Sequence, residues 1–225
     1  LSVAYSLINS INDKVMLIVS ETLSKILSPH DRGTSLLFGD GASAILISKD
    51  ENFKGKTYFN FFSDGGNYDA IIIPEGGYKK PFNSFSLDWC EDLKGNRKQG
   101  THLTMDGPRV FDFTLREVPK GIEELINKFD LNLDDIDAFL FHQSNKFIIK
   151  QISSRLKIPK DKVPMNIHKF GNTSGVSIPL LIISELEKDK VYNNLLMSGY
   201  GSGLNWGNCL MTLSPKLRRY NLIEL

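Results

Sequence analysis

The sequence predicts an α/β fold with a mixed sheet, and three observations lead to it. Short apolar runs alternate along the chain with longer segments of helical periodicity. Some of these runs, such as 138–141 (AFLF), are continuous, which is typical of a strand buried on both faces. The last two expected strands, 195–197 and 205–213, are joined only by a glycine-rich loop, which favours an antiparallel pair.

The individual elements follow from the same patterns. Residues 1–11 are expected to form a helix already under way at Leu1, because apolar residues share one face and no capping residue comes first. Further strands are expected at 15–19, 36–48 (around a glycine-rich turn), 53–62 and 70–73. Residues 76–100 are rich in Gly, Lys, Asn and Ser and predict a long surface excursion.

Three helices are expected from residue 106 onward. The longest begins at Asp106-Gly107-Pro108, a cap followed by an early proline, and its apolar residues step by three and four as far as Phe129. Pro119 should kink this helix, since proline has no N–H to donate. The same spacing predicts helices at 145–157 and about 176–188.

Composition excludes several classes of protein. The 225 residues are 41% hydrophobic and 24% charged with a net charge of +1, so nothing demands nucleic acid, a membrane surface or an acidic substrate. The two cysteines, Cys90 and Cys209, are far apart and form no C-x-x-C, so we expect neither a disulfide framework nor a metal site. No apolar run has the length of a membrane span, and a cytoplasmic location is expected.

Two polar motifs directly precede helices. His142, in 141–145 (FHQSN), follows an apolar strand, where α/β proteins collect site residues, but a histidine in such a turn can also satisfy local hydrogen bonds. Asn172, in 171–174 (GNTS), stands where ordinary N-caps are found. Taken alone, each motif leaves the structural interpretation open.

Two further motifs are glycine-rich or basic. Residues 199–207 (GYGSGLNWG) fail the dinucleotide pattern and predict either a tight turn or backbone N–H groups exposed to an oxyanion. Arg32, in 31–34 (DRGT) just before 38–42 (FGDGA), is explained equally well as solvated surface.

In their order, the segments DRGT, FGDGASA, MDGPRVF, FHQSN, GNTSGVSIP and GYGSGLNWG resemble the 3-oxoacyl-[acyl-carrier-protein] synthase III family along nearly the whole chain. The resemblance implies a thiolase-like fold with a mixed five-stranded sheet covered by helices. Residues 1–55 would be a remnant of the N-terminal half, and residues 56–225 the C-terminal half with the active-site His and Asn. The implied enzyme is an acyltransferase that condenses an acyl-CoA-derived acyl group with malonyl-acyl carrier protein to initiate fatty acid biosynthesis.

The resemblance also implies roles for single residues. His142 and Asn172 match the two donors to the malonyl thioester carbonyl, and the backbone N–H of Ser202 matches an oxyanion contact. The implied substrate-binding residues are Arg32, which would stack on the coenzyme A adenine, and Phe38, Gly107, Phe111, Ser144 and Asn145 around the pantetheine tunnel. No cofactor or metal is expected, because coenzyme A thioester and carrier-protein phosphopantetheine are substrates. Partners would be acyl carrier protein, acyl-CoA and, in the full-length enzyme, a second subunit in a homodimer; nucleic acid and membrane are not expected.

The nucleophilic cysteine of the family would lie about two helical turns before Leu1. Neither cysteine of the chain matches it, so the chain alone is expected to be inactive. Two positions that are often basic in the family hold Phe147 and Asp112. Two alternatives stay open: a specialised acyl or polyketide-type condensing enzyme, and a non-catalytic subunit of the same fold that binds a partner.

Overall fold

The computed structural model has the predicted α/β architecture, and it describes residues 1–187, 190–220 and 222–223. A mixed sheet lies at its centre with the strand order β3-β10-β9-β8. Its strands are β3 (Thr57–Ser63), β8 (Ala138–Phe141), β9 (Asn194–Gly201) and β10 (Asn205–Thr212). β8 runs parallel to β9, and the other neighbours are antiparallel, so the expected closing hairpin of β9 and β10 is confirmed.

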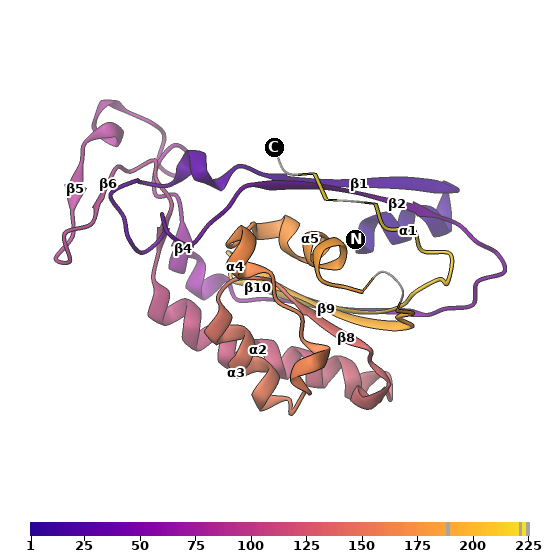
Figure 1. Ribbon diagram of the computed structural model, residues 1–225. Helices are drawn as coiled ribbons and strands as arrows, with labels where there is room; N and C mark the ends of the chain where they lie inside the picture. Colours follow the sequence, from indigo (N-terminus) through magenta and orange to yellow (C-terminus); the bar gives the residue numbers. More distant parts are fainter. Residues whose placement is uncertain (188–189, 221, 224–225) are drawn as a thin grey trace.

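Helices cover both faces of this sheet (Figure 1). α2 (Gly107–Lys128) and α3 (Lys146–Arg155) pack on one face, and α5 (Ser177–Ser184) packs on the other. Successive side chains of β8 alternate between the two cores, and all four of its residues are buried. A strand covered on both sides has no polar face, which explains the continuous apolar run at 138–141.

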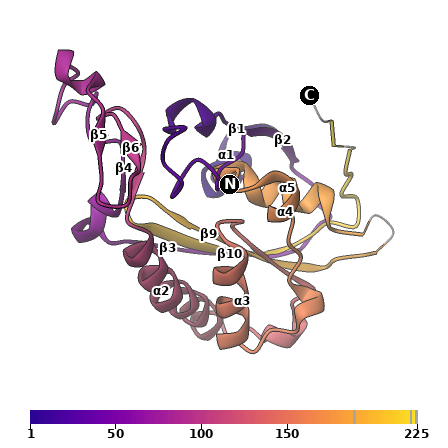
Figure 2. The same cartoon turned by 60° about the vertical axis from the view of Figure 1, so that its left-hand side comes forward.

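A two-stranded antiparallel ribbon lies on the far side of α5 from the sheet (Figures 1 and 2). It consists of β1 (Lys14–Glu21) and β2 (Gly41–Ser48), and α1 (Ser2–Ser10) packs beside it. β1 also contacts the short turn Ser174–Val176 that leads into α5. The ribbon therefore forms one wall of the space above the sheet. The division of the chain between residues 55 and 56 stays a prediction.

The central sheet has four strands among the described residues, so the expectation of five strands is wrong. The candidate at 70–73 forms only β4 (Ile71–Ile72), which pairs with β7 (Thr104–Met105) away from the main sheet. A 3-10 turn, Gly65–Ala70, ends directly before β4, and Pro74 follows it closely without an N–H to donate. The strand is consequently limited to two residues.

The long excursion is confirmed as a lobe that stands away from the sheet (Figure 2). It carries a short ribbon of β5 (Cys90–Glu91) and β6 (Arg97–Lys98). The remaining short elements are α4 (Ile167–Phe170) and 3-10 turns at Leu23–Ile26, Ser84–Leu87, Leu133–Asp135 and Lys160–Lys162. Within the described ranges, no helix is both long enough and apolar enough to cross a membrane.

α2 begins as predicted, because the Asp106 carboxylate caps it by accepting a hydrogen bond from the N–H of Arg109 at 3.1 Å. The helix continues through Pro119, which cannot donate to the carbonyl of Leu115 four residues earlier. Arg155, at the end of α3, supplies the missing donor, with its Nη1 at 2.9 Å from that carbonyl oxygen. A side chain from the neighbouring helix thus satisfies the polar group that the proline would leave unpaired.

Candidate active site

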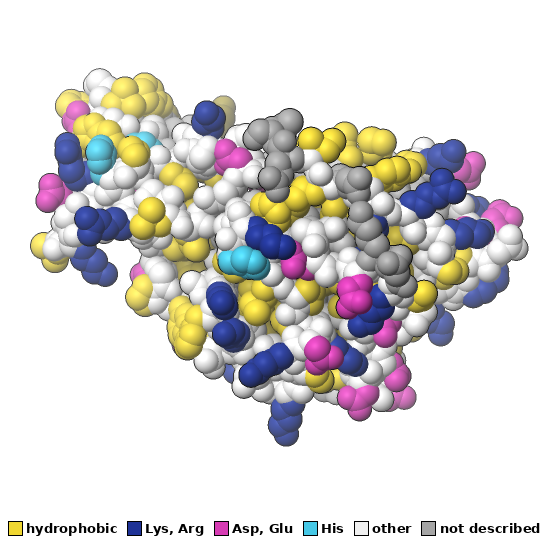
Figure 3. Space-filling view, in the orientation of Figure 1, with side chains coloured by type: hydrophobic (Ala, Val, Ile, Leu, Met, Phe, Trp, Pro, Cys, Tyr) yellow, Lys and Arg dark blue, Asp and Glu magenta, His cyan; other side chains and the backbone are white. Residues whose placement is uncertain are grey.

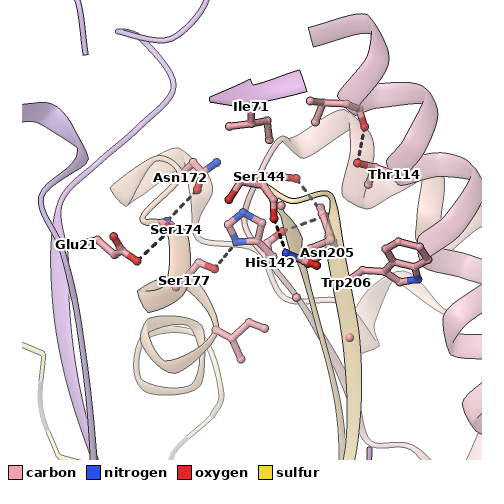
Figure 4. A pocket seen from close by; sticks show the side chains of 18 of the residues that line it. Glu21, Ile71, Thr114, His142, Ser144, Asn172, Ser174, Ser177, Asn205 and Trp206 are labelled. Carbon is pink, nitrogen blue, oxygen red and sulfur yellow. Dashed lines mark hydrogen bonds between the residues drawn. The ribbon is translucent and has the colours of Figure 1, made fainter. Parts of the chain in front are cut away.

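A cavity of about 1370 Å³ lies between the ribbon β1–β2, the central sheet and the start of α2. Apolar side chains make up much of its wall, including Leu17 and Ile45 of the ribbon and Met197 of β9. Polar side chains gather where β8 ends (Figure 4). Eight of the predicted site residues line the cavity: Phe38, Gly107, Phe111, His142, Ser144, Asn145, Asn172 and Ser202.

His142 is placed by the sheet itself. Its backbone N–H donates to the Ser198 carbonyl at 2.8 Å, which continues the parallel pairing of β8 with β9 by one residue. Gln143, fully buried, then locks the turn: its Nε2 donates to the Phe141 carbonyl, and its Oε1 accepts from the N–H of Asn166 at 3.0 Å. These bonds direct the His142 ring toward the cavity while the chain turns into α3.

The imidazole of His142 is neutral near pH 7. Burial lowers the pKa of His142 from 6.5 to about 4, since the charged ring would lose its hydration. Its Nδ1 lies 2.7 Å from the hydroxyl oxygen of Ser177, and its ring packs edge-on against Tyr200 with 5.3 Å between centroids. A neutral ring has one N–H to donate and one nitrogen to accept.

Asn172 reaches the cavity through a tight loop after α4. Its backbone N–H donates to the Leu37 carbonyl at 2.9 Å, and its carbonyl accepts from Gly39 at 3.0 Å. Gly171 turns the chain with φ +69°, where a Cβ would also lie 3.0 Å from the Leu37 carbonyl oxygen. The loop therefore needs glycine at 171 to bring Asn172 against the segment before β2.

The amide of Asn172 is oriented by its own loop. Its Oδ1 accepts a hydrogen bond from the backbone N–H of Ser174 at 2.9 Å, while the Ser174 hydroxyl donates to Glu21 of β1 at 3.2 Å. Because Oδ1 is engaged, the NH₂ group is the part of the amide left for a ligand. Figure 4 shows Asn172 and His142 approaching one space from two different loops.

Ser144 and Tyr200 also line the space beside His142 and Asn172. The Tyr200 hydroxyl donates to the His142 carbonyl at 3.1 Å, so it can accept from the Ser144 hydroxyl, also at 3.1 Å. Burial raises the pKa of Tyr200, which keeps the phenol protonated. Tyr200 and Ser177 were missed as site residues in the sequence, because they look like turn and helix positions.

Three further predicted residues, Asn145, Phe111 and Arg32, are exposed. Asn145 caps α3, with its Oδ1 accepting from the N–H of Phe147 at 2.8 Å. Phe111 of α2 stacks on Phe147 with 5.8 Å between ring centroids, and both rings are partly exposed. Arg32 is exposed in the loop before β2 and is not among the cavity-lining residues, so the structure does not bring it together with the others.

Neither cysteine has the environment of a nucleophile. Cys90 is exposed in β5 of the excursion. Cys209 of β10 does line the cavity, but burial raises the pKa of its thiol to about 12, so the reactive thiolate is scarce at neutral pH. Within the described part of the chain, no cluster of three or more His, Cys, Asp or Glu side chains could hold a metal ion.

Comparison with known proteins finds two matching sequence families. Residues 1–65 match "3-Oxoacyl-[acyl-carrier-protein (ACP)] synthase III", and residues 126–213 match "3-Oxoacyl-[acyl-carrier-protein (ACP)] synthase III C terminal". Beta-ketoacyl-[acyl-carrier-protein] synthase III of Streptococcus gordonii is 37% identical over 95% of this chain and 64% of the relative. The chain thus spans less than two thirds of that relative's length.

Solved structures give the same result for the fold. A crystal structure of a 3-oxoacyl-(acyl-carrier-protein) synthase III superposes with a TM-score of 0.88 and 30% identity, covering 94% of this chain and 64% of the other. The 3-oxoacyl-(acyl-carrier protein) synthase of Burkholderia xenovorans LB400 superposes with a TM-score of 0.82 and 36% identity, covering 95% and 60%. The predicted thiolase-like fold is that of these relatives.

Proposed function

The chain belongs to the 3-oxoacyl-[acyl-carrier-protein] synthase III family, and from this premise we propose that it supplies the decarboxylation site of a condensing enzyme. The enzyme joins an acyl group derived from acyl-CoA to malonyl-acyl carrier protein at the start of fatty acid synthesis. One observation carries the proposal: a neutral imidazole and a carboxamide, His142 and Asn172, reach one cavity from separate loops.

These two side chains suit the decarboxylation step. The bond between the malonyl carboxylate and its α-carbon breaks, carbon dioxide leaves, and the electron pair moves into an enolate whose oxygen becomes negative. Neutral N–H donors from His142 and Asn172 stabilise that oxygen. A positively charged side chain at the same place would instead attract the malonyl carboxylate. The enolate carbon then attacks an acyl thioester on a cysteine, and the cysteine thiolate leaves.

The cysteine that carries the acyl group has no counterpart in this chain, since Cys90 is exposed in the excursion and the thiol of Cys209 stays protonated. The backbone N–H of Ser202, at the cavity wall between β9 and β10, would stabilise the oxyanion formed when the enolate attacks. The 225 residues alone should therefore form no 3-oxoacyl product. Formation of that product by the isolated chain would contradict the proposal that the acyl-accepting cysteine lies outside these residues.

The decisive experiment separates the two half-reactions in a form of the protein that includes the acyl-accepting cysteine. His142→Ala should lower condensation by about 10²–10³, the usual cost of one lost oxyanion donor, and should change acyl loading far less. His168→Ala, which removes an exposed histidine of α4, is the matched control. Equal losses in loading and condensation would refute the role of His142.

The proposed substrates would enter past Phe111 and Phe147. Phe38, Gly107, Ser144 and Asn145 line the same cavity and would form the wall around the pantetheine arm, while Arg32 would meet the adenine outside it. Phe147 and Asp112 occupy the two positions that are often basic in the family. Asp112 is acidic and pairs with Arg116 at 3.1 Å. The stacked, partly exposed rings of Phe111 and Phe147 would make this part of the entrance apolar.

Docking of the acidic carrier protein would then depend on α3 beside that entrance. Lys146 and Lys150 are exposed on α3, and neither forms an ion pair within the described residues, whereas Arg155 is held by the Leu115 carbonyl. Figure 3 shows Lys and Arg side chains gathered on the face where α3 lies. Complementary charge of this kind mainly accelerates encounter.

This part of the proposal has its own test. Lys146→Glu with Lys150→Glu should raise the KM for malonyl-acyl carrier protein several-fold at low salt and leave the KM for acyl-CoA unchanged. Lys14→Glu with Lys54→Glu, at the exposed start of β1 and in the exposed loop before β3, serves as the charge-matched control. An unchanged KM for the carrier substrate would exclude this docking face. Homodimer formation and a cytoplasmic location stay predictions of the sequence.

A further inference from the structure

Ser177 makes a contact that the proposed reaction does not itself account for. It is the first residue of α5, is 1% exposed, and places its hydroxyl oxygen 2.7 Å from Nδ1 of His142. The second ring nitrogen, Nε2, has no hydrogen-bond partner among the described residues, and it faces the space shared with Asn172 and Ser144 (Figure 4).

The position of the single imidazole proton can be worked out from Ser177. If Nδ1 carried the proton and donated to Ser177, the hydroxyl hydrogen would need another acceptor, and the described residues provide none within hydrogen-bonding distance. A buried hydroxyl hydrogen without an acceptor is unfavourable, and it lowers the population of the Nδ1–H state roughly tenfold or more. The hydroxyl therefore donates to Nδ1, and the ring proton lies on Nε2.

We propose that Ser177 is a positioning residue that fixes His142 in the Nε2–H tautomer, with that N–H aimed at the space shared with the Asn172 amide. Its catalytic consequence rests on the proposed function, because only the Nε2–H form can donate to a thioester carbonyl there. Tyr200 assists by packing edge-on against the ring and holding the His142 carbonyl. The tautomer itself is a property of this chain that can be measured without any reaction.

Nitrogen NMR of the chain labelled with ¹⁵N-histidine tests the assignment directly. At pH 7 the His142 signals, identified by their loss in His142→Gln, should show a protonated Nε2 and an unprotonated Nδ1. Ser177→Ala should raise the Nδ1–H population about tenfold or more, because the donor to Nδ1 is gone. Ser177→Thr keeps a hydroxyl at the same place and should restore the wild-type pattern.

Ser184→Ala is the matched control, since Ser184 lies at the other end of α5 and accepts a hydrogen bond from Asn166 at 2.9 Å. It removes a hydrogen bond of the same helix and should leave the His142 signals unchanged. A wild-type chain with the proton on Nδ1 would overturn the proposal even if Ser177→Ala does not fold. An unaltered tautomer in folded Ser177→Ala would overturn it as well.

Kinetics then separate this proposal from the proposed function. In a form that includes the acyl-accepting cysteine, Ser177→Ala should lower the kcat of condensation about tenfold, with KM and acyl loading nearly unchanged and with Ser177→Thr active. If the wild-type tautomer is Nε2–H but no condensation occurs, the proposed function fails and the assignment of Ser177 stands. If condensation occurs and Ser177→Ala matches the wild type, the positioning role fails alone.

Discussion

Acid should destabilise this protein through His142, and replacement by glutamine should remove the effect. In the folded chain burial lowers the pKa of His142 to about 4, whereas an unfolded histidine keeps its ordinary value of 6.5. Below pH 6.5 the unfolded state therefore binds a proton that the folded state binds only near pH 4. Stability is fully present above pH 6.5 and is lost as the pH falls toward 4.

The size of the loss follows from the two pKa values. They differ by more than two pH units, and each unit corresponds to about 1.4 kcal/mol, so the wild type should lose about 3 kcal/mol through this residue between pH 7 and 4. His142→Gln keeps a polar side chain that can bond with Ser177 but has no proton to gain. Other titrating groups are shared by the two proteins, so their contributions cancel in the difference.

The assay is urea unfolding of both proteins at pH 7.0, 5.5 and 4.5, with free energies obtained by linear extrapolation. The wild type should lose about 2–3 kcal/mol more than His142→Gln between the first and last pH. Equal losses in the two proteins would show that the imidazole is not held neutral by burial. The electrostatic argument for His142 as a neutral donor would then fail with it.

Three further predictions concern the scaffold and the thiols. Arg155→Met should lower the unfolding free energy by about 1–3 kcal/mol in the wild type. It should lower it much less in Pro119→Ala, because the restored N–H of residue 119 can donate to the Leu115 carbonyl. Equal losses in the two backgrounds of this double-mutant cycle would refute the pairing of Arg155 with that carbonyl. In the native chain at pH 8, a thiol reagent should modify Cys90 quickly and Cys209 only on unfolding, and mass spectrometry of both sites checks this. Leu196→Ala should lower the unfolding free energy by about 2–5 kcal/mol in urea titrations, because Leu196 is 0% exposed in β9; a loss below about 1 kcal/mol would contradict that burial.

Local signals in the sequence were enough for the elements that depend on neighbours along the chain. The run at 138–141 predicts a strand with two covered faces, and the cap at Asp106 predicts the start of α2; the structure has both. The order of the six family motifs led to the family that the comparisons then matched. Such signals can be read from the sequence because a helix cap or a buried apolar run depends on residues that are adjacent along the chain.

Several sequence predictions failed or stopped short where a distant partner decides the outcome. The segment 36–48 was expected to form a strand, a glycine-rich turn and a second strand, but before the turn only Phe38 makes a bridge, and its partner is Asn172 more than a hundred residues later. The stretch at 70–73 turned away from the sheet to pair with β7. Strand pairing depends on which backbone lies beside the segment, and a local pattern does not contain that information.

The candidate site divides in the same way. Sequence alone determined that His142 and Asn172 stand at the ends of their segments with the polarity of donors, because motif and residue type are properties of the chain. Only the tertiary structure decided that both face one cavity, that Ser177 reaches the histidine ring, and that Tyr200 closes the space from β9. The physical reason is distance: a hydrogen bond is made within about 3 Å by groups that the chain separates by tens of residues, and packing alone brings them together.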